Sequence, residues 1–321
     1  TTGNSNSALG QYALDANTTG IENVAIGYYA LSGNTTASNN VAIGKSALYA
    51  NTTGTSNVAL GKDAMDANTT GSSNIAIGMD CLNTNTTAAD NVAIGRNAMQ
   101  ANTVGHSNVA VGKDALYTSV GETKNVAIGF EAAYRSNNGR TTAVGWQAGQ
   151  YISTGFNNTV LGVSVAQDLT TGDNNIVIGY GADAPVADSN NTCTFGNGSI
   201  DNLRCNDTSI SSLSDERDKT NIADLALGTA FLNTVRPVSF DWDRRDGTFA
   251  GYKSLGFIAQ ELKVAGDATD FADHMRLVHN DNPDKLEADP MKMFPIVIKA
   301  IQELSAENTA LTARITALEN A

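Results

Sequence analysis

Apolar residues in the first two hundred positions recur at one fixed interval along the chain. A typical unit reads Asn-Val-Ala-Ile-Gly, two variable residues, Ala-Leu, and then Asn-Thr-Thr-Gly near its end, as in residues 40–54. The spacing between units is 17 residues, with a single step of 16 before Gly145; the glycines that close the apolar motif are at 10, 27, 44, 61, 78, 95, 112, 129, 145, 162, 179 and 196. Such self-similarity predicts an architecture of stacked repeats.

Each unit contains the signals of a short strand followed by turns. Valine and isoleucine are β-branched and lie two positions apart, so they share one face of a strand. The glycine and the Asn-Thr-Thr-Gly run supply turn residues. One such unit cannot bury an apolar face alone, whereas stacked copies can. We therefore predict a mainly β protein whose residues 1–200 form a β-solenoid or β-roll.

The residue between valine and isoleucine is alanine in most units, so both faces of the strand are apolar. One face can fill the roll, and the other needs a second cover. A flat ladder of alanines suits close packing against a sister chain. We expect this ladder to lie at an interface between copies, although alanine that merely tolerates exposure is the alternative.

The repeat motif resembles the head domains of trimeric autotransporter adhesins, whose β-rolls carry a similar short apolar repeat, and it looks like the repeat shafts of phage tail fibres. The resemblance covers roughly residues 4 to 200. The unit here is longer than that of the adhesins, so the resemblance concerns architecture and leaves the loop geometry open. It implies a trimeric, fibrous shaft.

The composition changes near residue 214. Residues 1–214 contain eight Lys and Arg with fifteen Asp and Glu, against twelve and eighteen in the remaining 107. We expect a linker over 201–213 and a small α/β domain over 214–321. Within it, Phe231–Trp242 predicts a helix end and then a strand, and Leu255–Leu262 predicts a short strand that runs into a helix.

The last segment, 295–321, predicts a coiled-coil helix that begins at Pro295. Its apolar positions follow a heptad with Ile301, Asn308 and Ile315 at position a and Leu304, Leu311 and Leu318 at position d. So narrow a stripe favours partners of the same kind, and a buried Asn308 would fix their register. A single helix docked on its own domain is the alternative.

Three motifs, "SDERDKTNI" from Ser214, "LGFIAQEL" and "AIQEL", resemble the endosialidase-type intramolecular chaperone found at the C-terminus of phage tail spikes and fibres. The match spans residues 214–321. It implies that Ser214 and Lys219 form a self-cleaving dyad, with Arg217, Gln260 and Glu261 in support. Asp218 stands where many members carry an apolar residue.

The chemistry of a Ser-Lys dyad sets conditions on the fold. Serine needs a base to take its proton, and a lysine can do so only when it is neutral, which requires desolvation or neighbouring cations. Five residues along a helix or a strand would separate the two side chains, so a turn or a partner chain must bring them together. The Oγ of Ser214 reaches the carbonyl of Leu213 more readily than its own, so we place the cut at Leu213–Ser214 rather than Ser214–Asp215. A simple helix N-cap at Ser214 is the alternative.

Several other classes of function are disfavoured. The net charge of -13 makes nucleic acid an unsuitable partner. No apolar run approaches the length of a membrane span, and no signal peptide is recognisable. Cys81, Cys193 and Cys205 form no cluster, and His274 and His279 match no metal motif, so we expect neither a metal nor a cofactor.

We therefore expect a homotrimeric tail-fibre segment for host attachment, found in the virion after assembly in the host cytoplasm. Its partners would be a host receptor or glycan and other tail proteins. The autopeptidase would act once, on its own chain, and no turnover enzyme is expected. A polysaccharide-degrading tail spike and a bacterial trimeric adhesin fragment are the alternatives, and the missing initiator methionine suggests a fragment.

Overall fold

The computed structural model describes residues 2–137, 139–200, 203–204, 214–245, 251–280, 282–284 and 286–320. The chain divides into two compact units, Thr1–Ile200 and Asp201–Ala321. Each is described by itself below.

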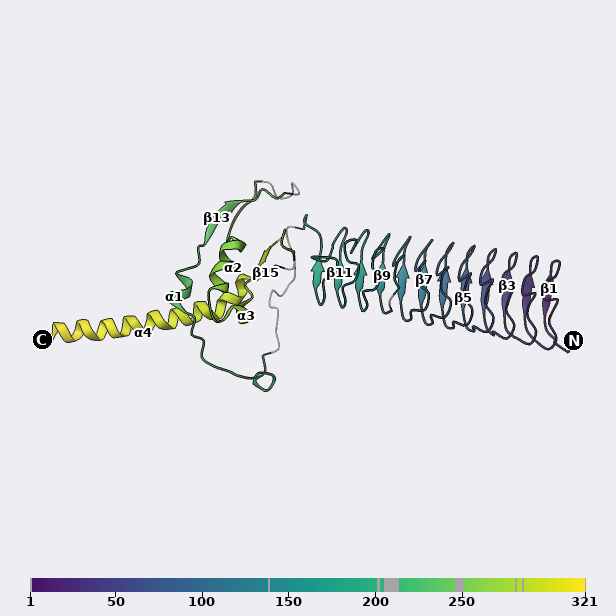
Figure 1. The fold of residues 1–321 in the computed structure, drawn as a ribbon, viewed down its shortest axis with the longest axis horizontal. Coiled ribbons are helices and arrows are strands. Elements are labelled where there is room, and N and C mark those ends of the chain that lie inside the picture. The colour runs from purple at the N-terminus through teal and green to yellow at the C-terminus, as the bar shows by residue number, and fades with distance from the viewer. Residues whose placement is uncertain are drawn as a thin grey trace. The chain divides into compact units, whose positions relative to one another are not determined.

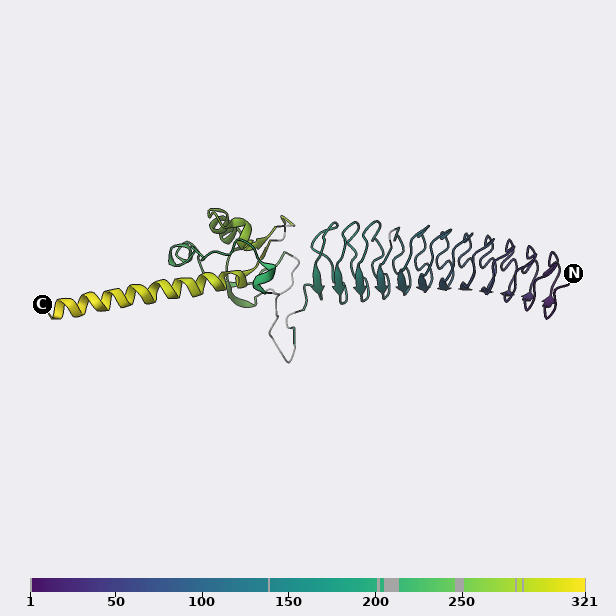
Figure 2. The ribbon, with the colours of Figure 1, turned by 90° about the horizontal axis from the view of Figure 1, so that it is seen from below.

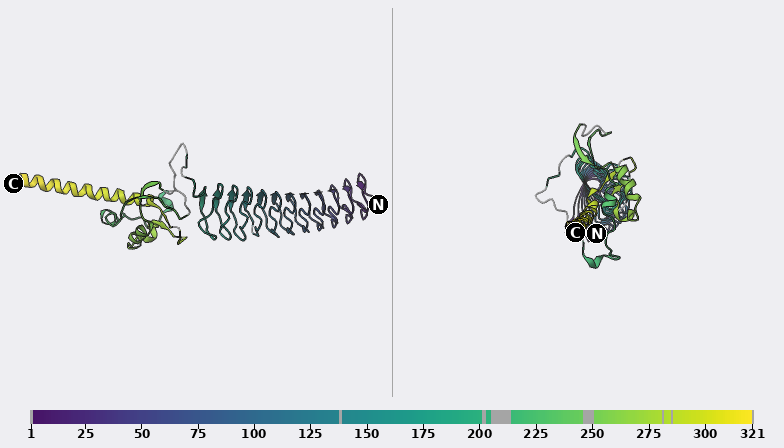
Figure 3. Two further views of the ribbon diagram at one scale, coloured as in Figure 1. Left: turned by 90° about the horizontal axis from the view of Figure 1, so that it is seen from above. Right: turned by 90° about the vertical axis from the view of Figure 1, so that its left-hand side faces the viewer.

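The first unit is a β-solenoid, as the repeat predicts. Each coil contributes one strand of three residues to a single parallel sheet, in which each strand pairs with the next in chain order (Figure 1). The strands are β1 Ser7–Leu9, β2 Val24–Ile26, β3 Val41–Ile43, β4 Val58–Leu60, β5 Ile75–Ile77, β6 Val92–Ile94, β7 Val109–Val111, β8 Val126–Ile128, β9 Thr142–Val144, β10 Thr159–Leu161, β11 Ile176–Ile178 and β12 Cys193–Phe195. In Figure 2 the arrows lie along one edge of the stacked coils, and the left view of Figure 3 shows this edge from the opposite side.

The strand register follows the sequence repeat, with Ala59 opposite both Ala42 and Ala76. Stacked coils approach so closely that the glycine at the end of each strand has no room for a side chain. A Cβ on Gly61 would lie 2.4 Å from the carbonyl oxygen of Gly78, and Gly61 has a φ of +145°. The invariance of this glycine from coil to coil therefore has a steric cause.

The central alanine of strands β2 to β9 points into the coil, which corrects our placement of the alanine ladder at a chain interface. Ala59 and Ala76 are fully buried inside a single chain, while their strand neighbours Leu60 and Ile75 are 41 and 37 % exposed. The coil is narrow, and alanine at this position leaves space for the leucine or methionine of the Ala-Leu pair, which is also buried. The uncovered apolar face is thus the outer one, with valine, isoleucine and leucine.

Two ladders of buried asparagines run along the solenoid beside this apolar core. One consists of the asparagines of the Asn-Thr-Thr runs and the other of the asparagines that directly precede most strands. The Asn68 carboxamide donates to the Oδ1 of Asn51 at 2.8 Å and to the carbonyl of Gly71 at 3.0 Å, and that same carbonyl accepts from Asn57 at 2.8 Å. The asparagines thus satisfy buried carbonyls and one another across successive coils.

The second unit is the small α/β region that the sequence predicts. Its elements are η1 Glu216–Asp218, α1 Thr229–Leu232, β13 Val238–Asp241, β14 Lys253–Gly256, α2 Ala259–Asp267, α3 Ala272–Met275, β15 Val278–His279, β16 Glu287–Ala288, η2 Pro290–Met293 and α4 Phe294–Glu319. Phe231, Leu262, Met275, Leu277, Met293 and Ile296 form its core. Strands β13 and β14 pair antiparallel, as do β15 and β16.

Helix α4 packs on this core only through its first turns. Ile296 and Ala300 are buried, whereas Ile301 is 61 % exposed and Leu318 is 77 % exposed. Every described residue from Leu304 onward is exposed, and Figure 1 shows the helix running away from the rest of its unit. The alternative in which the whole helix docks on its own domain is therefore wrong for this chain.

The inward alanine yields a first prediction. We expect Ala76→Glu to destabilise the shaft by several kcal/mol, because it places an unpaired charge inside the coil. The neighbouring variant Ile75→Glu should leave the melting temperature of the dissociated chain nearly unchanged, since that side chain faces outward. Thermal unfolding followed by circular dichroism would compare the two, and equal melting temperatures would contradict the inward orientation.

Candidate active site

The segment after residue 213 folds into one tight turn. Asp215 is the N-cap of η1, and its carboxylate accepts a hydrogen bond from the backbone N–H of Arg217 at 2.9 Å. Lys219 ends the turn in an extended conformation, with its N–H donating to the carbonyl of Glu216. The cap is therefore Asp215, and the alternative in which Ser214 serves as the cap is wrong.

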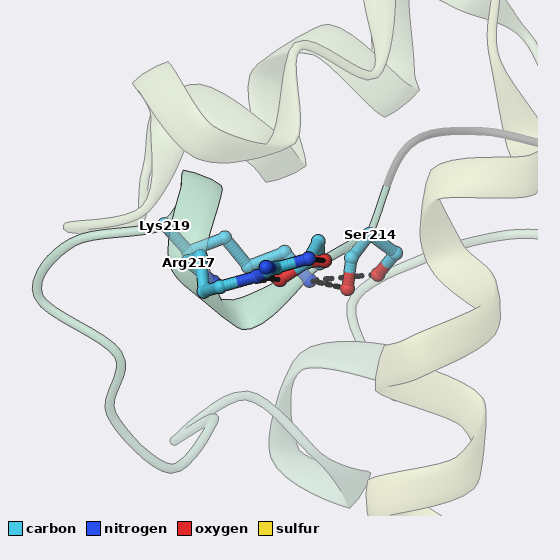
Figure 4. Close-up of polar contacts among 4 residues, drawn as sticks. Ser214, Arg217 and Lys219 are labelled. Atoms are coloured by element: carbon cyan, nitrogen blue, oxygen red, sulfur yellow. Dashed lines mark hydrogen bonds and ion pairs between the residues drawn. The ribbon is translucent and has the colours of Figure 1, made fainter.

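This turn brings the side chains of Ser214 and Lys219 together. The Nζ of Lys219 donates to the Oγ of Ser214 at 2.7 Å and to the Ser214 carbonyl at 3.1 Å (Figure 4). Both residues are exposed in the single chain. The contact is short enough for direct proton transfer between a serine hydroxyl and a lysine amine.

The side chain of Arg217 forms hydrogen bonds within this turn. Its Nε and Nη2 donate to the two carboxylate oxygens of Asp215 at 3.0 and 2.6 Å. These hydrogen bonds hold the pKa of Asp215 below its usual value. Arg217 thus fixes the carboxylate that caps the turn, and its described hydrogen bonds go to Asp215 rather than to Ser214 or Lys219.

Gln260 and Glu261 belong to a different place in the unit. Glu261, on α2, forms a paired contact with Arg236, whose Nε and Nη2 donate at 2.9 and 2.5 Å, and this contact lowers the pKa of Glu261. Gln260 and Glu261 line an open groove of about 840 Å³ together with Leu227, Phe231 and Val264. Among the described residues, no hydrogen bond or ion pair joins Gln260 or Glu261 to Ser214 or Lys219. Leu213 lies outside the described residues.

A carboxylate that we did not single out from the sequence joins α4 to α1. Glu303 accepts hydrogen bonds from the N–H and the hydroxyl of Thr229, at 2.8 and 2.7 Å. Gly228 allows this approach, because a Cβ there would lie 2.3 Å from the carboxylate. Glu303 follows the seam residue Ile301 by two positions, so the helix turn that carries the seam also holds the start of α1.

The rest of the described chain offers little other chemistry. No group of three or more His, Cys, Asp or Glu among those residues could hold a metal ion. Burial raises the pKa of the Cys81 thiol to about 12, so this thiol is a core group. The candidate chemistry of the described part therefore lies at the Ser214–Lys219 turn.

Within the described part of the chain, no helix combines the length and the apolar character needed to cross a bilayer.

The Glu303 contact predicts a pH dependence for the second unit. Hydrogen bonds from Thr229 lower the pKa of Glu303 in the fold, so its stabilising effect is present above the unfolded pKa of ~4.3 and is lost as the pH falls through the folded pKa. Glu303→Gln still offers an oxygen to Thr229 but cannot titrate. We expect the parent to lose more thermal stability than this variant between pH 7 and pH 3, and parallel curves would refute the effect.

Comparison with known proteins places the turn within a recognised domain. Residues 214–275 match the model of the peptidase S74 family, described as chaperone of endosialidase, and the match begins at Ser214. No curated protein and no solved structure shows significant similarity to the chain. A β-solenoid followed by this domain supports the resemblance to phage tail fibres with a C-terminal chaperone. The chain thus carries a chaperone-of-endosialidase domain that follows its β-solenoid in the sequence.

Proposed function

We propose that the protein is a homotrimeric tail-fibre segment of a phage virion for host attachment, whose C-terminal domain guides assembly and is then released by self-cleavage at Ser214. The observation that carries the proposal is the 2.7 Å contact between Lys219 and Ser214, at the first residue of the matched domain. The host receptor or glycan would bind the fibre, and other tail proteins would hold it.

The cleavage is an N-to-O acyl shift followed by hydrolysis. A neutral Lys219 takes the proton of the Ser214 hydroxyl, and the Oγ attacks the carbonyl carbon of Leu213 through a five-membered path. The bond from that carbon to the Ser214 nitrogen breaks, and the nitrogen takes up a proton, which leaves an ester. Water then hydrolyses the ester to a carboxylate at Leu213 and restores the hydroxyl of Ser214.

We expect cleavage to depend on assembly. In the single chain Ser214 and Lys219 are both exposed to water. Partner chains that cover the turn would remove water and favour the neutral amine. Cutting would then follow correct assembly and would not precede it.

Two apolar surfaces of the single chain favour self-association. One is the heptad seam of α4, where Ile301, Leu304, Leu311, Ile315 and Leu318 are all at least half exposed. The other is the outer face of the solenoid sheet, with Leu60, Ile75 and Leu161. Isoleucine at a with leucine at d favours two-stranded coils when it acts alone. A trimer therefore depends on the shaft and the chaperone domain as well as on the helix.

The cleavage is tested by intact mass. The parent should yield two fragments, one ending at Leu213 and one beginning at Ser214, without added protease. Ser214→Ala should remain whole at 33.4 kDa. Lys219→Arg should also remain whole, because arginine keeps the positive charge and the donor but cannot become a base. Cleavage in either variant, or an intact parent after assembly, would refute the mechanism.

The coupling of cleavage to assembly is tested at the helix. Leu304→Asp with Leu311→Asp should lower the oligomeric state in light scattering and should abolish cleavage. Ala306→Asp with Ala313→Asp adds the same charges to a face away from the seam and should leave both unchanged. A parent mass of three chains is expected, whereas two chains would refute the trimer. Cleavage in the monomeric variant would show that the turn acts without partners.

A further inference from the structure

Four aromatic side chains lie in the turns that follow strands β7, β8 and β9. Phe130 and Trp146 directly follow the glycines that end β8 and β9, and Tyr117 and Tyr134 lie five positions after the glycines that end β7 and β8. These positions vary from coil to coil, and an earlier coil has Lys62 directly after its glycine. The fold therefore does not require aromatic rings here, and exposed rings of this size point to a binding surface.

The four rings form two parallel pairs. The ring centroids of Phe130 and Trp146 are 5.9 Å apart with an interplanar angle of 11°, and those of Tyr117 and Tyr134 are 5.1 Å apart at 4°. Trp146 is 47 % exposed, and no ring of the described residues other than Phe130 contacts it. The next coil has Val163 at the corresponding position. Much of the indole surface is therefore open to a ligand.

Charged side chains of the same turns lie close to both ring pairs. The Nζ of Lys113 lies 3.1 Å from the Oδ2 of Asp114 and 4.9 Å from the ring centroid of Phe130 in the next coil. Burial raises the pKa of Tyr134, and the charges of Asp114 and Glu131 raise it further. The carboxylates therefore share one surface with the rings.

Glu131 lies at the centre of a hydrogen-bonded group of side chains. Its Oε2 accepts from the Nε2 of Gln147 at 2.7 Å and from the Nε2 of Gln150 at 2.6 Å, and all three side chains are half-buried. In the described part of the chain, the Oε1 atoms of these three residues accept no hydrogen bond, and no cation pairs with Glu131. The group therefore presents fixed acceptors beside Trp146, the residue that precedes Gln147.

The kind of ligand follows from this combination of groups. Unpaired acceptors require donors, and an exposed ring requires a flat apolar partner. A pyranose ring supplies both, because its C–H hydrogens meet the negative face of an aromatic ring while the hydroxyls around its edge donate hydrogen bonds. An acidic sugar would bring its own carboxylate close to Glu131, where like charges repel. A neutral sugar is therefore the better fit.

We propose that this surface binds a neutral pyranose-based glycan. Trp146 is the platform for one sugar ring, and Glu131, Gln147 and Gln150 accept hydrogen bonds from its hydroxyls. The inference rests on the attachment role proposed above, and it places the glycan site in the turns after β7 to β9.

Tryptophan fluorescence tests the binding. The chain has two tryptophans, so Trp242→Phe leaves Trp146 as the reporter. We expect a saturable change of its emission with short oligosaccharides of glucose, galactose, mannose or N-acetylglucosamine, and none with oligomers of sialic acid. The proposal would be overturned if no neutral oligosaccharide changed the emission, or if the acidic oligomers bound more tightly.

Calorimetry with the neutral oligosaccharide that binds best locates the site. Trp146→Ala should abolish binding, and Glu131→Ala should weaken it about tenfold. Tyr180→Ala is the matched control, because Tyr180 has the corresponding position two coils after Trp146 and is 73 % exposed, but has no ring partner among the described residues. Parent-like binding by Trp146→Ala, or loss of binding by Tyr180→Ala, would contradict the site.

Light scattering and intact mass separate this site from the proposed function. Trp146→Ala should retain the oligomeric state and the self-cleavage of the parent. Loss of assembly in this variant would make the surface a contact between chains and would overturn the glycan site. A parent that assembles and cuts itself but binds no neutral oligosaccharide would refute this site alone, whereas a parent that neither assembles nor cuts itself would refute the proposed function.

Discussion

Every coil of the shaft depends on the hydrogen bonds that it exchanges with the coils on either side. Many backbone groups of each coil bond to the neighbouring coils, and an unpaired carbonyl inside a protein is costly. Asparagine answers this constraint because one carboxamide both donates and accepts. Asn51 accepts from Asn68 while it donates to Asn34, so the bonds pass along the column. The close stacking of the coils also explains why the glycine after each strand has no room for a side chain.

The repeat gave the number and the position of the strands, but not their orientation. Alternation places Ala59 and Val58 on opposite faces, and both faces are apolar, so the period alone cannot say which one points inward. In the fold Ala59 faces inward, and the asparagines of the Asn-Thr-Thr runs are buried although their sequence resembles a surface turn. The spacing from Ser214 to Lys219 required a turn, and η1 supplies it. The Glu303 contact joins residues 74 apart, and no local pattern signals such a pair.

The second unit has a buried core, but two of its notable features are exposed in the single chain. Phe231, Leu262 and Ile296 are buried in the single chain, while the α4 seam and the Ser214–Lys219 turn are exposed. Glu303 joins α1 to α4, the helix that carries the seam. In the proposed assembly, the exposed seam and the Ser214–Lys219 pair are the parts of this unit that partner chains would cover.

The uniform strand register of the first coils has a consequence for how such a shaft can evolve. From β2 to β8 each strand pairs with the next at the same 17-residue offset, so one coil meets almost the same neighbour wherever it stands. Duplication or loss of a whole unit there would change no core contact in kind. Whole units can therefore be gained or lost in steps of ~4.8 Å of solenoid length, one strand spacing at a time, without any change in the second unit.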